Sequence, residues 1–171
     1  MNTVLGIPTH PFLGHLAAAV IPLTALLVVL VALIPRLPQL LRWTTFVLSA
    51  LSVALVAVTE SSGEALMRQI QKTALNRQHA QIGDDLMPWV IGLFVVCVAL
   101  LVANYWTRLR IGERPGRPHP SSALSRRSSL IVRITFGLIA LAVATGAIVE
   151  TVRIGHSGAE ATWLSHPVAG M

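Results

Sequence analysis

An apolar run from residue 12 to residue 34, free of Asp, Glu, Lys and Arg, constrains the fold of this chain more than any other feature. A helix rises about 1.5 Å per residue, so a run of this length matches a hydrocarbon core of roughly 30 Å. The residues before it contain no Lys or Arg, and no small-x-small cleavage site follows it, so we do not expect a secretory signal peptide. We predict a membrane-spanning helix.

Three further apolar runs follow, at residues 43–60, 86–106 and 130–152. With 54% hydrophobic and 12% charged residues, the chain is too apolar for a soluble domain of its size. Small residues in the fourth run, such as Gly137 and Ala144, favour close packing between helices. The sequence therefore predicts an all-α fold, a four-transmembrane-helix bundle that forms a single membrane domain over residues 1–171.

Arginines predict how this bundle is oriented. The connections over residues 35–42 and 107–129 contain eight of them: Arg36, Arg42, Arg108, Arg110, Arg114, Arg117, Arg126 and Arg127. Because cytoplasmic loops are enriched in Lys and Arg, we expect both connections in the cytoplasm and both termini outside, in a bacterial cytoplasmic membrane. This arrangement also explains the net charge of +6, so we expect membrane lipids as partners and no nucleic acid.

The segment between the second and third runs differs from an ordinary loop. Its apolar residues keep roughly helical spacing between Leu66 and Leu86. One interpretation is a helical hairpin that projects beyond the bilayer and turns near Lys72-Thr73, which would place Glu64 and His79 at about the same height. The alternative is an interfacial helix that lies on the membrane.

Ligand-type side chains gather at the predicted outer end. Five of the six histidines belong there: His10, His15, His79, His156 and His166. Imidazole and carboxylate groups coordinate Zn, Fe and Cu, and helical bundles build such sites from facing helices. Non-covalent b-type haem needs only histidine ligands, so it is a second candidate cofactor. Because His10 and His15 are five residues apart with Pro11 between them, any site must combine different helices.

The same histidines also have structural interpretations. His15 lies at the entrance of a span, where an imidazole can simply hydrogen-bond a neighbouring helix. His10 precedes Pro11 and suits a polar cap. His166 is close to the C-terminus, where chain ends fray, so we expect no role for it.

The carboxylates divide in a similar way. Glu64, Asp84 and Asp85 suit a solvated face, and the two aspartates also suit the first turn of the third span. Glu150 and Arg153 have the spacing of a helical ion pair. Glu60 follows an apolar run at the membrane boundary, where an ionisable group is costly unless it reaches water or a partner. Glu60 and Glu150 are therefore candidates for a proton relay.

Motifs of common enzyme classes are absent from the sequence. It contains no Gly-x-Ser-x-Gly elbow, no phosphate-binding glycine loop and no Cys-x-x-Cys-His. The last absence excludes covalently attached haem of the c type. We find no catalytic motif and expect that the chain is not an enzyme by itself.

Several of these residues lie in motifs that resemble a family of bacterial membrane proteins catalogued as domain of unknown function 2231. The matching stretches are Gly6 to His15, Ser62 to Leu66, His79 to Gly83, and Arg153 to Ala159 with Trp163. The resemblance implies four transmembrane helices and a shared cluster of His10, His15, Glu64, His79 and His156. Some members are joined to Rieske iron-sulfur domains, which implies redox work, but the family brings no established activity.

These observations lead to one principal functional hypothesis. We expect the outer cluster to bind a metal ion (Zn, Fe or Cu) or b-type haem in a redox or metal-handling process, with a redox partner or membrane complex as a possible associate. One alternative is a cofactor-free structural or assembly subunit of a membrane complex. A proton-relay protein or small-solute carrier is the third, and the sequence leaves the oligomeric state open.

Overall fold

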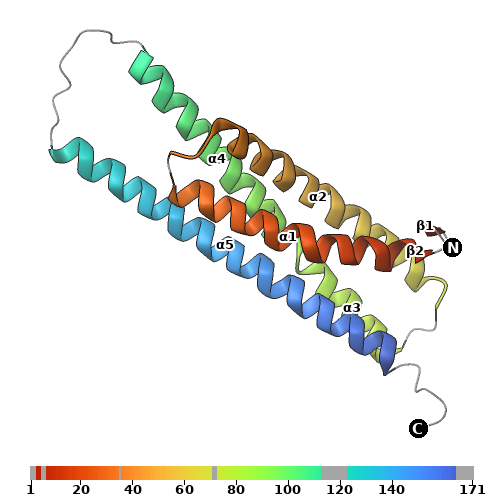
Figure 1. Cartoon of the computed structure of the whole chain (residues 1–171). Helices are drawn as coiled ribbons and strands as arrows, with labels where there is room; N and C mark the ends of the chain where they lie inside the picture. Colours follow the sequence, from red (N-terminus) through yellow and green to blue (C-terminus); the bar gives the residue numbers. More distant parts are fainter. Residues whose placement is uncertain (1–2, 5–6, 35, 71–72, 113–122, 165–171) are drawn as a thin grey trace.

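The computed structural model of this chain is an elongated helical bundle (Figure 1). It describes residues 3–4, 7–34, 36–70, 73–112 and 123–164. Five helices follow a short antiparallel hairpin: β1 (Thr3–Val4), β2 (Ile7–Pro8), α1 (Thr9–Leu33), α2 (Gln39–Met67), α3 (Ala74–Asp84), α4 (Met87–Gly112) and α5 (Ala123–Trp163). The all-α prediction is confirmed apart from this hairpin, which pairs Thr3 with Pro8 and Val4 with Ile7.

Prolines and one threonine mark where the helices begin. Pro11 lies in the first turn of α1, Pro38 directly precedes α2, and Pro88 is the second residue of α4. Proline fits these positions because the first amides of a helix have no intrahelical acceptor. Thr73 caps α3, and its side chain accepts a hydrogen bond from the backbone amide of Asn76 at 3.2 Å.

Four helical stretches are long and apolar enough to cross a membrane, as the sequence predicted. They cover Thr9–Leu33, Gln39–Met67, Ala74–Trp106 and Leu130–Trp163. Each helix extends beyond its predicted apolar run at one end or at both, because polar residues there continue the same helix. Leucine, isoleucine and valine side chains are exposed along all four, which suits contact with lipid. The chain is a multi-pass membrane protein.

Helix α1 occupies the centre of the bundle and packs against α2, α4 and α5 (Figure 1). Its buried residues Ile21, Ala25 and Val28 follow a helical period and face the other helices. On α5 the buried side chains are small, including Ala140, Ala144 and Ala147. Small side chains let helix backbones approach closely, which is how helices associate in lipid.

Polar side chains form most of the buried face of α2. Thr45, Ser49 and Ser52 are fully buried, and each hydroxyl donates to a carbonyl of its own helix at 2.8 Å. Between helices, Ser52 Oγ lies 3.2 Å from Thr24 Oγ1 of α1. Each hydroxyl therefore keeps a bonded proton in an apolar interior, where an unsatisfied polar group costs several kcal/mol.

The prediction that Arg42 lies in a loop is wrong. Arg42 belongs to the first turns of α2, because the helix begins at Gln39, and the residue is only 5% exposed. Its neighbour Arg36 remains in the connection between α1 and α2. The predicted linker is also shorter in the structure, since α4 continues to Gly112 and α5 begins at Ala123, while residues 113–122 lie outside the described residues.

One end of the bundle collects the start of α1, the end of α2, all of α3 and the end of α5 (Figure 1). The connection between α1 and α2 lies at the other end, together with the end of α4 and the start of α5. Helix α3 packs mainly on α5 and has no buried residue. Histidines from α1, α3 and α5 are thereby brought to one end of the molecule.

A substitution at Gly146 tests the packing of α4 on α5. A methyl group added there would collide with the Trp89 ring, whereas nothing lies within 4 Å of the same position at Gly155. We expect Gly146→Ala to cost about 1–3 kcal/mol through overpacking. Gly155→Ala, on the same helix, should be neutral or stabilising by up to about 1 kcal/mol because alanine favours helix. Unfolding of both variants in detergent with increasing SDS measures the difference, and equal midpoints would contradict this packing.

Candidate functional site

His10 connects the start of α1 to the end of α2. Its Nδ1 lies 2.9 Å from the backbone oxygen of Thr59 and 3.3 Å from Ser62 Oγ. A carbonyl oxygen can only accept, so Nδ1 of His10 carries the proton. In the neutral imidazole this leaves the lone pair on Nε2.

His79 makes the equivalent connection between α3 and α5. Its Nδ1 lies 2.9 Å from Ser157 Oγ. Ser157 Oγ also lies 3.0 Å from the backbone oxygen of Ile154, which can only accept, so a hydroxyl proton bonded there leaves the serine oxygen to accept from Nδ1–H of His79. In that arrangement His79, like His10, carries its proton on Nδ1 and keeps its lone pair on Nε2.

The two imidazoles meet between these helices. Their ring centroids are 6.1 Å apart, and the planes are inclined by 73° in an edge-to-face contact. Both residues are half-buried. Four helices thus contribute to the pair: α1 and α3 supply the rings, and α2 and α5 supply the groups that hold them.

The other predicted ligands have their recorded polar partners within their own helices. His15 is exposed and donates from Nδ1 to the Pro11 carbonyl at 2.7 Å. His156 has a side chain that is 76% exposed, with Nε2 3.2 Å from Glu160 Oε1. Glu64 is also exposed and forms a 3.6 Å ion pair with Arg68. His10 and His79 are therefore the two predicted ligands that the structure brings into contact.

No third ligand completes a metal site within the described part of the chain. There, no three His, Cys, Asp or Glu side chains lie close enough to hold one ion. Cys97 is buried in α4, within the apolar core. His119 and His166 lie outside the described residues. Any ion at the histidine pair would keep coordination positions open to water or to another molecule.

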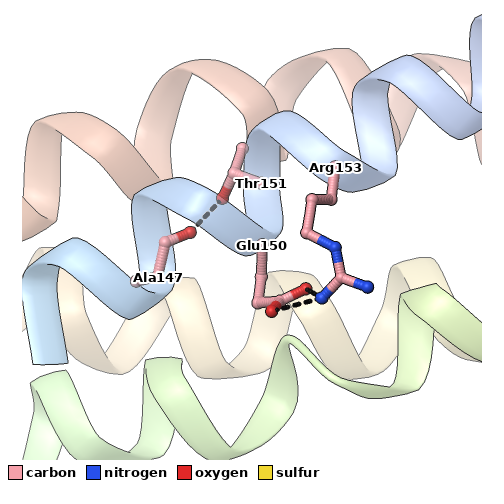
Figure 2. A network of polar contacts seen from close by, with 4 residues as sticks. All are labelled: Ala147, Glu150, Thr151 and Arg153. Atoms are coloured by element: carbon pink, nitrogen blue, oxygen red, sulfur yellow. Dashed lines mark hydrogen bonds and ion pairs between the residues drawn. The ribbon is translucent and has the colours of Figure 1, made fainter.

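The two candidate relay carboxylates differ in their surroundings. The Glu150 side chain is only 12% exposed and forms a two-pronged ion pair with Arg153, at 2.7 and 2.8 Å (Figure 2). Beside it, Thr151 donates to the Ala147 carbonyl at 2.7 Å. Glu60 has one buried oxygen, Oε1, with no hydrogen-bond partner among the described residues. No contact that the structure records joins Glu60 to Glu150.

The segment between α2 and α4 is helical, as its apolar spacing predicted. Among the contacts recorded for the described residues, none joins Glu64 to His79, however. Because α3 packs mainly on α5, His79 faces Ser157 and His10, whereas Glu64 points to Arg68. Apolar spacing identified the helix, but its packing partner depended on the whole bundle.

The serines that hold the imidazoles were not among the predicted site residues. Ser62 and Ser157 each precede a glycine, Gly63 and Gly158, at the ends of α2 and α5. A Ser-Gly dipeptide at the same end of two spans is visible in the sequence. Nothing in the sequence shows, however, that each dipeptide faces a histidine of another helix.

Comparisons with known proteins found no match to this chain. No protein-family model matches the chain, no curated protein matches it, and no solved structure matches its fold.

Paired cysteines test the arrangement of this end of the bundle. In a Cys97→Ala background, the pair His10→Cys and His79→Cys should crosslink rapidly with a short bifunctional thiol reagent, because the native rings are in contact. The matched pair Glu64→Cys and His79→Cys should crosslink much more slowly. Gel mobility after timed quenching measures both rates, and the reverse order would show that α3 packs on α2 instead of α5.

Proposed function

We propose that this protein binds a transition-metal ion or b-type haem through His10 and His79 and serves a redox or metal-handling process. The observation that carries the proposal is the pair of bonded Nδ1 atoms. His10 donates Nδ1–H to the Thr59 carbonyl, and Nδ1 of His79 is bonded to the Ser157 hydroxyl, so both rings are held through Nδ1 with Nε2 available for a ligand. Metal-binding histidines characteristically donate their second nitrogen in this way.

The residues present fit a borderline divalent ion such as Zn²⁺ or Cu²⁺. Such ions take neutral imidazole at about 2.0–2.1 Å, and two imidazoles on one ion have ring centroids roughly 5–6 Å apart. The observed 6.1 Å is close to this range. Two protein ligands leave room for water or for donors of a second molecule, which suits an ion that is exchanged or that reacts.

Haem is the second form of the same proposal. His10 and His79 come from different helices and would supply neutral imidazoles to the iron, but because the two rings are in contact they would have to separate to admit haem. The two cofactors differ in their observables: haem gives a strong Soret band that shifts on reduction, and a bare ion does not.

We further propose that the histidine end faces the periplasm or cell exterior of a bacterium, with the chain in the cytoplasmic membrane. The support is the arginine distribution, because the connection with Arg36, the end of α4 with Arg108 and Arg110, and the start of α5 with Arg126 and Arg127 lie at the opposite end (Figure 1). The sequence resemblance to the bacterial membrane-protein family catalogued as domain of unknown function 2231 supports a bacterial membrane as the location, and the orientation rests on the arginines alone.

A structural or assembly subunit is the second candidate function. It is favoured by the fact that the hydrogen bonds of His10 and His79 each join two helices. In that case the imidazoles stabilise the end of the bundle by about 0.6–2 kcal/mol each, as interhelical hydrogen bonds do in membranes, and no cofactor is bound.

Metal binding distinguishes these functions. Purified wild-type protein should bind about one equivalent of zinc or copper, or show a Soret band after native expression. His10→Ala and His79→Ala should each lower the affinity at least tenfold, whereas His15→Ala and His156→Ala should retain it, because those residues bond within their own helices. Elemental analysis, calorimetry and visible spectra measure these quantities.

The pH dependence provides an independent check of imidazole ligation. Affinity for zinc should fall as pH decreases through about 6 to 7, because protonated imidazole has no lone pair to donate. If the wild-type protein binds neither zinc, copper nor haem, while His10→Ala and His79→Ala lower only thermal stability, the structural-subunit function is correct.

Single cysteines test the proposed orientation. In the Cys97→Ala background, a membrane-impermeant maleimide should label Gly170→Cys in right-side-out vesicles and Ser121→Cys in inverted vesicles. Because the arginine-rich linker is expected inside, a membrane-impermeant maleimide added to intact cells should label Gly170→Cys only. Labelling of Ser121→Cys from outside would reverse the orientation and place the histidine pair in the cytoplasm.

A further inference from the structure

Two Ser-Gly dipeptides lie directly against the histidine pair. At Gly63 of α2, an added Cβ would come within 2.8 Å of His10 Cε1. At Gly158 of α5, it would come within 3.1 Å of His79 Cε1. The 2.8 Å approach at Gly63 would force the His10 ring to shift, and the 3.1 Å approach at Gly158 would require the His79 ring to move by a few tenths of an ångström. Each imidazole therefore lies close against a helix at a glycine.

The serine before each glycine bonds both a carbonyl of its own helix and a histidine ring. Ser62 donates its proton to the Thr59 carbonyl at 2.7 Å, and Ser157 donates to the Ile154 carbonyl at 3.0 Å. With each hydroxyl proton bonded to its own helix in this way, each oxygen is left to face a histidine Nδ1, at 3.3 Å for His10 and 2.9 Å for His79. The same two residue types thus perform the same two tasks on α2 and on α5.

We propose that Ser62-Gly63 and Ser157-Gly158, called here the Ser-Gly pairs, are positioning residues that hold His10 and His79 as Nδ1–H tautomers with both Nε2 atoms free for one borderline divalent ion. Glycine lets the ring lie against the helix, and the serine oxygen accepts only from a protonated Nδ1. The inference rests on the proposed metal-binding function for its ligand, but the tautomers themselves do not depend on a metal.

This arrangement also specifies the class of ion. Neutral imidazole nitrogens favour Zn²⁺, Cu²⁺ or Ni²⁺ over the hard ions Mg²⁺ and Ca²⁺, which take oxygen ligands. Binding through Nδ1 is excluded at both rings as long as the Ser-Gly pairs and the Thr59 carbonyl engage that nitrogen. The site should therefore take its ion through Nε2 alone.

The two Ser-Gly pairs differ in one respect that sharpens the test. His10 has a second acceptor, the Thr59 carbonyl at 2.9 Å, which no side-chain substitution removes. The one hydrogen bond recorded for the His79 ring is to Ser157. Ser157→Ala should therefore disturb His79 far more than Ser62→Ala disturbs His10.

Nitrogen NMR of histidine-labelled, metal-free protein in detergent tests the tautomers. Wild-type His10 and His79 should both show Nδ1–H spectra, identified through the variants His10→Ala and His79→Ala. Ser157→Ala should convert His79 to a mixture of tautomers, Ser157→Thr should restore the wild-type pattern by keeping the hydroxyl, and Ser62→Ala should leave His10 nearly unchanged. Identical His79 spectra in wild type and Ser157→Ala would overturn the proposal.

Zinc affinity, measured on the same variants, tests the consequence for the ligand. Gly63→Ala, Gly158→Ala and Ser157→Ala should weaken zinc binding about 10–100-fold, the usual effect of removing a group that orients a ligand. Gly155→Ala and Gly83→Ala are matched controls, since nothing lies within 4 Å of either position, and both should bind zinc as wild type does.

The two measurements separate the possible failures. If the NMR spectra show the expected tautomers but the wild-type protein binds no zinc, copper or nickel, the proposed function and the ligand named here are contradicted. Normal zinc binding in Gly63→Ala, Gly158→Ala and Ser157→Ala would overturn the positioning role alone. Magnesium or calcium competing equally with zinc would contradict the assignment of the ion to Nε2.

Discussion

The need to bond buried polar groups within the protein underlies both the bundle and its histidine pair. In lipid no water accepts a free N–H or O–H, so hydroxyls such as those of Thr45 and Ser49 donate to carbonyls of their own helix. A hydroxyl at the end of the bundle also bonds a carbonyl of its own helix, and this affects the neighbouring imidazole. Ser157 donates to Ile154, and its oxygen is then left to accept from His79. With the hydroxyl proton bonded to the Ile154 carbonyl, His79 donates from Nδ1 and keeps its lone pair on Nε2.

The architecture places this pair where several helices end together. Helix α1 packs against α2, α4 and α5, and α3 is laid on the end of α5. Because α3 buries none of its residues, its apolar contacts hold it less firmly than those of the long helices. The contact of His79 with Ser157 and His10 therefore matters for the position of α3. An ion shared by His10 and His79 would join α3 to the start of α1.

The candidate site is smaller than the cluster of five residues that the sequence suggested. The sequence assigned His15, His156 and Glu64 to the same end of the bundle. In the structure, the recorded partner of each lies within one turn of its own helix. Side chains one helical turn apart find each other at little entropic cost, which explains these local pairs. His10 and His79 meet instead through long-range packing. The proposed ligand set is therefore a pair with open positions, which suits exchange of an ion more than its permanent storage.

The sequence by itself determined the helical class and the four spans, because long apolar runs with few or no charges satisfy their backbone hydrogen bonds in lipid as helices. It also identified His10 and His79 among the ligand-type residues. It misplaced Arg42 in a loop, because α2 begins with polar residues before its apolar run starts. Tertiary structure alone decided that α3 packs on α5 and that Gly63 and Gly158 face imidazoles. Such contacts depend on the rotation of each helix about its axis, which follows from packing across the whole bundle and not from local periodicity.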